Sequence, residues 1–234
     1  MLRFILGRAG TGKTTELTEH IRARVQAGGS VILLVPEQYS FESERRLYRL
    51  LGPRGNLSVQ VLSFTRLCDN IFRRFGGLAG MPVTKPAKYL LMSAALAQLE
   101  EELTVYRKSA VNIGFVETML NTCSEFKTAG ITPAQLLRFA RSCEPGGLGG
   151  KLSDLCLVYG TYQAMLEKGY TDAEDNLIRA CELLENNDFF DGTDVCVDGF
   201  TTFMAAEFEL ISHIITHARS ITVALTADSS RDES

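Results

Sequence analysis

A glycine-rich segment near the start of the chain constrains the fold more than any other part of the sequence. Residues Gly7 to Thr14 read GRAGTGKT and match the pattern G-x-x-x-x-G-K-[ST] without substitution. An apolar run, Leu2–Leu6, precedes this segment, and a helical repeat of apolar residues follows it. A strand, a glycine loop and a helix in this order predict a phosphate-binding loop (P-loop).

The residue types of this loop predict its contacts. Glycines allow backbone N–H groups to point inward at phosphate oxygens, Lys13 should reach the β and γ phosphates, and Thr14 should offer its hydroxyl to Mg²⁺. The alternative is a glycine-rich turn that only looks like such a loop. We expect an ATP and Mg²⁺ site made by Gly7, Arg8, Ala9, Gly10, Thr11, Gly12, Lys13, Thr14 and Thr15.

Apolar segments alternate with helical repeats at both ends of the chain. Continuous apolar strands between helices predict an α/β fold, a parallel sheet of the P-loop NTPase (RecA-like) type with helices on both faces. The expected strands lie near Leu2–Leu6, Val31–Val35, Val59–Leu62, Val195–Asp198 and Ile221–Leu225.

The middle of the chain has no convincing strand pattern and instead contains five helical repeats. We therefore expect residues 81–189 to form an all-helical insertion into a RecA-like domain of residues 1–80 and 190–234. Thr132 before Pro133 predicts one helix start, and Thr171 with Glu174 predicts another through a capping box.

Composition excludes several classes of protein. The 234 residues, 45% of them hydrophobic, can bury the core of one large or two modest domains, and the net charge of −4 excludes an overall basic coat for nucleic acid. No apolar run is long enough for a membrane span, and Arg3 and the glycines interrupt any signal-peptide pattern. We expect a cytoplasmic protein with no membrane contact.

Cysteine and histidine spacing argues against a metal cluster. The six cysteines form no C-x-x-C pair, and the chain has only three histidines, so neither a zinc site nor an iron–sulfur cluster has its usual spacing. Most of the cysteines fall on apolar positions, which predicts that they are small core residues.

One carboxylate is well placed to assist a bound metal ion. Asp198 ends an apolar strand, so it should hold the water shell of Mg²⁺ at the carboxyl edge of the sheet. The next residue is Gly199, where a hydrolase usually has a glutamate that orients water. Asp198 could instead cap its own turn, and Glu37 or Glu207 could supply the base.

Several blocks of the sequence together resemble a known family. LRFILGRAGTGKTTEL, LLVPEQYSFESERRL, VQVLSFTRLCDNIFRRFGG and VCVDGFTTFMAAEFELI follow one another as in the N-terminal part of AddB, one of the two subunits of the bacterial ATP-dependent helicase/deoxyribonuclease AddAB. The resemblance implies a superfamily 1 helicase-like scaffold that forms a heterodimer with the motor subunit of AddAB and works on single-stranded and double-stranded DNA during the processing of double-strand breaks. It also implies a second RecA-like domain and a nuclease domain with an iron–sulfur cluster, both outside these residues.

The same resemblance carries residue roles. It implies that segments after the second and third strands contact DNA, and it puts Asp228 near a further helicase motif. Because Gly199 replaces the usual glutamate, we expect this portion alone to be a poor ATPase. Because the implied nuclease domain lies outside these residues, we also expect no nuclease activity. The implied DNA-contacting residues are Gln38, Ser63, Phe64, Thr65 and Arg66.

Two other functions compete with this interpretation. Residues 5–36 also resemble the opening of thymidine kinases, but those enzymes carry a cysteine zinc site that this chain lacks. A P-loop scaffold that binds nucleotide only to hold a protein partner is the second rival.

Arginines on two predicted helices could form a DNA track or could be solvated faces. They are Arg45, Arg46, Arg49, Arg66, Arg73 and Arg74.

Overall fold

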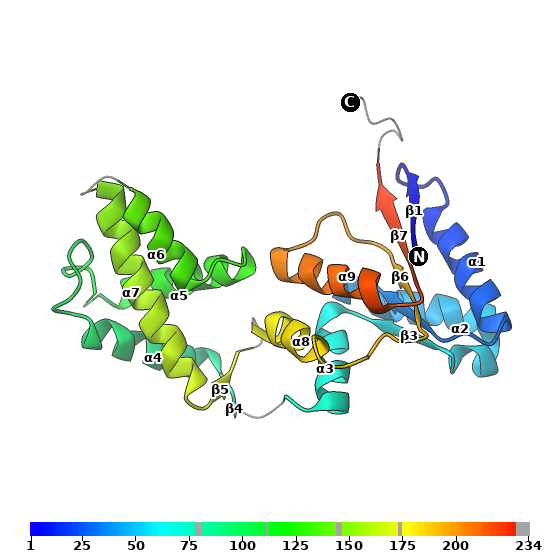
Figure 1. Cartoon of the computed structure of the whole chain (residues 1–234), viewed down its shortest axis with the longest axis horizontal. Helices are drawn as coiled ribbons and strands as arrows, with labels where there is room; N and C mark the ends of the chain where they lie inside the picture. Colours follow the sequence, from blue (N-terminus) through cyan, green and yellow to red (C-terminus); the bar gives the residue numbers. More distant parts are fainter. Residues whose placement is uncertain (78–80, 111, 144–146, 173–174, 228–234) are drawn as a thin grey trace. The chain divides into compact units, whose positions relative to one another are not determined.

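The chain folds into two compact units. A computed structural model describes residues 1–77, 81–110, 112–143, 147–172 and 175–227. The α/β unit comprises Met1–Gly77 and Leu177–Ser234, and the helical unit comprises Leu78–Asn176 (Figure 1). Residues 177–189 thus group with the α/β unit, whereas the sequence pattern predicts an insertion that continues to residue 189.

The α/β unit is built on a five-stranded parallel sheet with the strand order β1-β7-β6-β2-β3. All five predicted strands are present, and each lies within two residues of its expected position. The strands are β1 (Leu2–Gly7), β2 (Val31–Leu34), β3 (Val59–Leu62), β6 (Asp194–Val197) and β7 (Ser220–Thr226).

Helices cover the two faces of this sheet because successive side chains of each strand point to opposite faces. In β2, Val31 and Leu33 pack with helices α1 and α2, whereas Ile32 and Leu34 pack with α3, α8 and α9. This arrangement explains why the inner strands are continuously apolar. The helices are α1 (Lys13–Gln26), α2 (Ser40–Asn56), α3 (Phe64–Phe75), α8 (Asn176–Leu184) and α9 (Ala205–His217).

Strand β1 differs from the inner strands because only one of its faces is covered. Only Ile5 is buried, and the side chains of Leu2, Phe4 and Leu6 on the opposite face are 42%, 52% and 48% exposed. The apolar run predicts a strand covered on both faces, but β1 lies at the edge of the sheet and is covered on one face. The prediction of a strand is therefore confirmed, and the prediction that both of its faces are covered is wrong.

The helical unit contains four of the five helices that the repeats predict; the fifth is α8. Its core joins Met92, Met119 and Tyr162 from three helices, α4, α5 and α7. No helix among the described residues combines the length and apolar character needed to cross a membrane. The four helices are α4 (Lys85–Gln98), α5 (Ile113–Thr128), α6 (Pro133–Ser142) and α7 (Gly147–Glu167).

The helix start at Thr132 is confirmed. Its hydroxyl accepts a hydrogen bond from the Gln135 N–H, and the Gln135 side chain accepts one from the Thr132 N–H. The prediction for Thr171 is wrong, because Thr171 lies in strand β5 (Tyr170–Thr171), which pairs in parallel with β4 (Met81–Pro82). The insertion is therefore not all-helical, and Glu174 lies outside the described residues.

A group of buried charges holds the helical unit together. The ammonium of Lys127 on α5 lies 3.2 Å from a carboxylate oxygen of Asp172 and 2.8 Å from one of Asp175, and Lys88 on α4 lies 2.8 Å from Asp172. The side chains of Lys127 and Asp172 are only 3% and 2% exposed. Such a cluster depends on mutual pairing, because an isolated buried charge is costly.

Replacing Lys127 with methionine is expected to destabilise the helical unit by about 3 kcal/mol, because Asp172 and Asp175 would lose a buried partner while the side-chain volume is kept. Urea unfolding can be followed by tyrosine fluorescence, since five of the seven tyrosines lie between residues 81 and 176 and the chain has no tryptophan. Lys85→Met on the exposed start of α4 is the control. Equal midpoints for the two variants would contradict the proposed role of the cluster.

Candidate functional site

The predicted site residues converge because all strands of the sheet are parallel. Segments that follow parallel strands meet at one edge of the sheet, where open α/β folds bind their ligands. Here that carboxyl edge carries the glycine loop after β1, residues 36–39 after β2, residues 63–66 after β3 and Asp198 after β6. Asp228 lies outside the described residues.

The glycine loop has the backbone that its sequence predicts. Gly10 and Gly12 have φ values of +78° and +91°, a region that other residues rarely adopt, and Gly12 is the N-cap of α1. A Cβ atom on Gly7 would stand 2.5 Å from Oγ1 of Thr11, whose hydroxyl donates to the Arg8 carbonyl. The backbone therefore favours glycine at positions 10 and 12, and a side chain at position 7 would displace the Thr11 hydroxyl.

Lys13 is folded across this loop. Its ammonium donates to the carbonyl oxygens of Gly7, at 2.8 Å, and Arg8, at 2.7 Å. The ammonium is thus held against the loop that precedes α1, and the dipole of α1 favours an anion at the same end of the helix. A positive charge, the N–H groups of a helix start and tight glycine turns make this loop suitable for phosphate oxygens.

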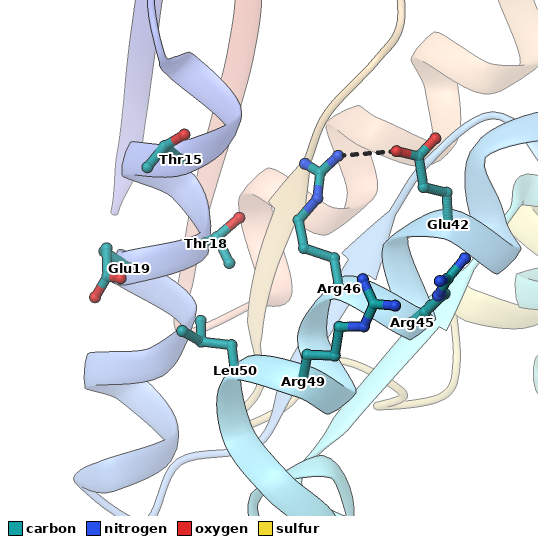
Figure 2. A pocket seen from close by; sticks show the side chains of 8 residues that line it. All are labelled: Thr15, Thr18, Glu19, Glu42, Arg45, Arg46, Arg49 and Leu50. Carbon is teal, nitrogen blue, oxygen red and sulfur yellow. Dashed lines mark hydrogen bonds and ion pairs between the residues drawn. The ribbon is translucent and has the colours of Figure 1, made fainter.

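The next two threonines face different surroundings. Thr14 is half-buried and its backbone carbonyl accepts from the Thr18 hydroxyl, at 2.5 Å. Thr15 is exposed and lines a hollow between α1 and α2 (Figure 2). Arg8 and Ala9 are exposed in the loop.

Asp198 lies two strands away from the loop, because β7 separates β1 from β6. Two strand spacings are about 10 Å, a distance that a nucleotide phosphate and a hydrated Mg²⁺ together can span. One Asp198 oxygen accepts from the Gly199 N–H at 2.9 Å, and within the described residues the other oxygen has no partner. The Thr14 hydroxyl and the Asp198 carboxylate are oxygen donors of the kind that Mg²⁺ prefers.

The two glutamates considered as alternative bases differ in the structure. The Glu207 carboxylate accepts from the Met204 N–H at 2.8 Å and so holds the start of α9. Glu37 is exposed in a short 3₁₀ helix, Glu37–Tyr39, at the same edge as Asp198. Glu37 is therefore the better placed of the two to act on water.

The residues that the resemblance assigns to DNA divide into exposed and buried groups. Gln38, Thr65 and Arg66 are exposed, and Arg66 forms an ion pair of 2.8 Å with Glu44. Ser63 is 3% exposed, and its hydroxyl accepts from the Arg66 N–H as the N-cap of α3.

Phe64 is 6% exposed and packs edge-on against Phe200 and Phe203, with ring centroids 5.3 and 6.4 Å away. This aromatic cluster was not predicted from the sequence. The two phenylalanines of the FTTF segment at residues 200–203 were the signal that could have indicated it. Phe64 thus belongs to the hydrophobic core at this edge of the sheet. Its contact with DNA stays a prediction.

The cysteines also occupy core positions, as predicted for most of them. Five of the six are buried, and all six are free thiols. Burial raises the pKa of Cys68, Cys181 and Cys196 to about 12, so these thiols stay protonated and unreactive at neutral pH.

Comparison with known proteins identifies the family. Residues 4–234 match the family described as ADDB, N-terminal. The B-subunit of the ATP-dependent helicase/deoxyribonuclease of Thermoanaerobacter sp. (strain X514) is 36% identical over 233 residues, and that of Clostridioides difficile (strain 630) is 35% identical over 232 residues. These alignments cover 99% and 97% of this chain but 20% of each relative, so the chain spans about a fifth of their length. The chain belongs to the AddB N-terminal family.

Proposed function

We propose that the α/β unit is the helicase-like, ATP-binding portion of an AddB-type helicase–nuclease subunit, which acts in the cytoplasm on DNA double-strand breaks for recombinational repair. ATP would bind at residues 7–15 with Mg²⁺ between Thr14 and Asp198, and single-stranded DNA would cross the carboxyl edge of a RecA-like sheet. The motor subunit of the same enzyme is the proposed heterodimer partner. The observation that carries this proposal is the glycine loop with the Lys13 ammonium held across it.

Replacing Lys13 with alanine is expected to weaken binding of a nonhydrolysable ATP analogue by about 30- to 150-fold, or about 2 to 3 kcal/mol, because a charge-assisted contact to the phosphates is lost. Calorimetric titration in the presence of Mg²⁺ measures this difference. Lys151→Ala, an exposed change in the helical unit, is the control. Equal affinity of the Lys13 variant and the unaltered chain would refute the nucleotide site.

A scaffold that binds nucleotide only to hold a partner protein is the second candidate. The lack of a glutamate after Asp198 and the engagement of Glu207 with the start of α9 support binding without hydrolysis. Titration with a single-stranded oligonucleotide separates the two functions. Binding of nucleotide and of the motor subunit, with no DNA binding, would favour the scaffold.

A further inference from the structure

Helix α2 separates two open hollows on the outer surface of the α/β unit. The first, of about 640 Å³, lies between α1 and α2 (Figure 2), and the second, of about 620 Å³, lies between α2 and the edge strand β3. Arg45 lines both hollows. We call the surface formed by Phe41, Arg45, Arg46, Tyr48 and Arg49 the α2 ridge.

The α2 ridge is more positive than the rest of the chain. Five arginines and three glutamates line the two hollows, whereas the whole chain has a net charge of −4. Two of the glutamates are already paired with these arginines, Glu42 with Arg46 at 3.3 Å and Glu44 with Arg66 at 2.8 Å. Positive charge at this surface is therefore only partly balanced within the fold.

Arg45 and Arg49 have no carboxylate partner among the described residues. They lie one helical turn apart on α2, and like charges at that spacing destabilise a helix slightly. A bound polyanion would remove this repulsion. The Thr15 and Thr18 side chains on the opposite wall of the first hollow add hydroxyl groups.

Two aromatic rings on the same helix are exposed to solvent. The side chains of Phe41 and Tyr48 are 76% and 52% exposed, and both line the second hollow. They are seven residues apart, which is about 10 Å along a helix, and Arg45 lies between them. Exposed rings with an arginine between them are typical of surfaces on which nucleic-acid bases stack.

The side-chain order around α2 follows from helical periodicity. Ser40 and Leu47 are buried toward the sheet, so the residues that follow each of them, Phe41 and Tyr48, point toward β3. Arg46 and Arg49 line only the first hollow, on the side of α1. The aromatic rings of the α2 ridge therefore face the second hollow, and Arg46 and Arg49 face the first. Arg45 lies between them and borders both hollows.

We propose that single-stranded nucleic acid crosses the α2 ridge, with bases stacked on Phe41 and Tyr48 and phosphates against Arg45 and Arg49. This inference rests on the proposed DNA binding and extends it from the carboxyl edge to the outer face of α2. A polyanion with planar groups matches both the arginines and the rings. An acidic peptide would match only the arginines.

The test uses the whole chain and a fluorescein-labelled 15-nucleotide oligo(dT), followed by fluorescence anisotropy. Phe41→Ala/Tyr48→Ala should weaken binding by at least about fivefold, since stacking contributes about five- to 150-fold for each base. The same variant should bind an abasic oligomer of equal length as well as the unaltered chain does. Arg45→Ala/Arg49→Ala should weaken both oligomers and lower the slope of log affinity against log salt by about 1.4.

Matched controls lie on α6, which carries exposed arginines and an exposed phenylalanine. Arg138→Ala/Arg141→Ala and Phe139→Ala should leave oligomer affinity unchanged. Thermal unfolding midpoints for every variant confirm that the fold is intact.

Three results would overturn the α2 ridge as a nucleic-acid site. If Gln38→Ala weakens oligo(dT) binding and the ridge variants do not, DNA binds at the carboxyl edge alone and the proposed function stands. If the unaltered chain binds the ATP analogue but neither oligomer, the ridge and the DNA part of the proposed function both fail. If poly-glutamate binds through Arg45 and Arg49 while oligo(dT) does not, the surface recognises an acidic peptide.

Discussion

ATP turnover by this chain, measured at steady state with saturating single-stranded DNA, is expected to stay below about 1 s⁻¹, the lower end of the range for ordinary enzymes. Hydrolysis requires a neutralised γ-phosphate and a water aligned for in-line attack, and an arginine finger alone contributes about 10³- to 10⁵-fold. In the proposed site Thr14 and Asp198 would hold Mg²⁺, so we expect nucleotide binding to persist while the chemical step is slow. A coupled assay of phosphate release measures the rate.

The geometry around Gly199 shows why a glutamate introduced at this position would not be a simple repair. Gly199 has a φ of +81°, and a Cβ there would lie 3.2 Å from Cδ of Pro36 and 3.3 Å from Cδ2 of Tyr39. Any side chain at this position costs about 1 to 2 kcal/mol from backbone strain alone. Gly199→Glu is therefore expected to destabilise the turn rather than to restore fast hydrolysis.

Glu37→Gln is the more informative variant for the same question. Turnover above about 1 s⁻¹ that Lys13→Ala abolishes would show that the site is catalytically complete and that the slow-ATPase prediction is wrong. Loss of that turnover in Glu37→Gln as well would identify Glu37 as the base. Glu209→Gln on the exposed part of α9 is the control for a change from glutamate to glutamine.

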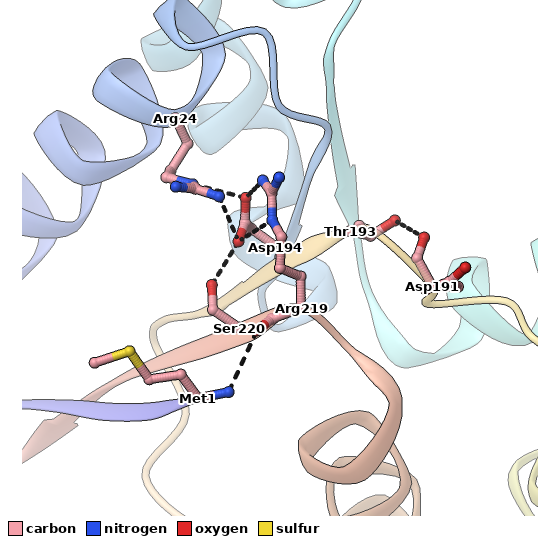
Figure 3. A network of polar contacts seen from close by, with 7 residues as sticks. All are labelled: Met1, Arg24, Asp191, Thr193, Asp194, Arg219 and Ser220. Atoms are coloured by element: carbon pink, nitrogen blue, oxygen red, sulfur yellow. Dashed lines mark hydrogen bonds and ion pairs between the residues drawn. The ribbon is translucent and has the colours of Figure 1, made fainter.

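Replacing Asp194 with asparagine is expected to lower the free energy of unfolding of the α/β unit by about 2 to 3 kcal/mol. Asp194 is fully buried at the start of β6, and its carboxylate accepts from Arg24 on α1, from Arg219 before β7 and, at 2.5 Å, from the Ser220 hydroxyl (Figure 3). Removing one side of a buried ion pair is strongly destabilising. The loss is reduced here because the Arg24 and Arg219 side chains are 33% and 42% exposed and can return to water.

The same network predicts a pH dependence. Burial alone raises the pKa of Asp194, but hydrogen bonds from Arg219, Arg24 and Ser220 outweigh it and lower the pKa from 3.8 to about 2. Because the folded-state pKa is the lower one, the stabilisation is fully present above about pH 4 and is lost as the pH falls toward 2. The shift corresponds to about 2 kcal/mol at neutral pH.

Thermal unfolding of the two proteins between pH 7 and pH 2 tests this dependence. The difference in stability between the unaltered chain and Asp194→Asn should be constant down to about pH 4 and should shrink below it. Asp191→Asn, a nearby exposed change (Figure 3), should unfold like the unaltered chain at every pH. A difference that persists unchanged to pH 2 would contradict the lowered pKa.

Much of the α/β unit could be predicted because its signals are local. The motif from Gly7 to Thr14 requires a turn that few other residues can make, and the positive φ values of Gly10 and Gly12 confirm this backbone. The strands were predicted to within two residues because a sheet covered on both faces demands continuous apolar runs in its inner strands. Thr132 was a reliable helix start because a threonine N-cap followed by proline at the first helical position is a signal between neighbouring residues.

The prediction failed where the outcome depended on distant partners. The two-residue strands Met81–Pro82 and Tyr170–Thr171 have no apolar repeat of their own and pair across almost 90 residues of sequence. The exposure of one face of β1 depends on whether a helix packs over that face, and the apolar run alone does not contain that information. The burial of Ser63 and its role as the N-cap of α3 were not part of the prediction, and its contact with DNA stays a prediction.

The sequence alone determined the glycine loop, the parallel α/β class, the family and the residues that follow each strand, because these depend on local backbone preferences and hydrophobic period. Only the tertiary structure decided that β7 separates Asp198 from the loop, that Asp194 meets Arg24 and Arg219, and that α2 presents rings on one flank and arginines on the other. Strand order and ion pairs between distant residues depend on how all elements pack at once, so no local pattern specifies them.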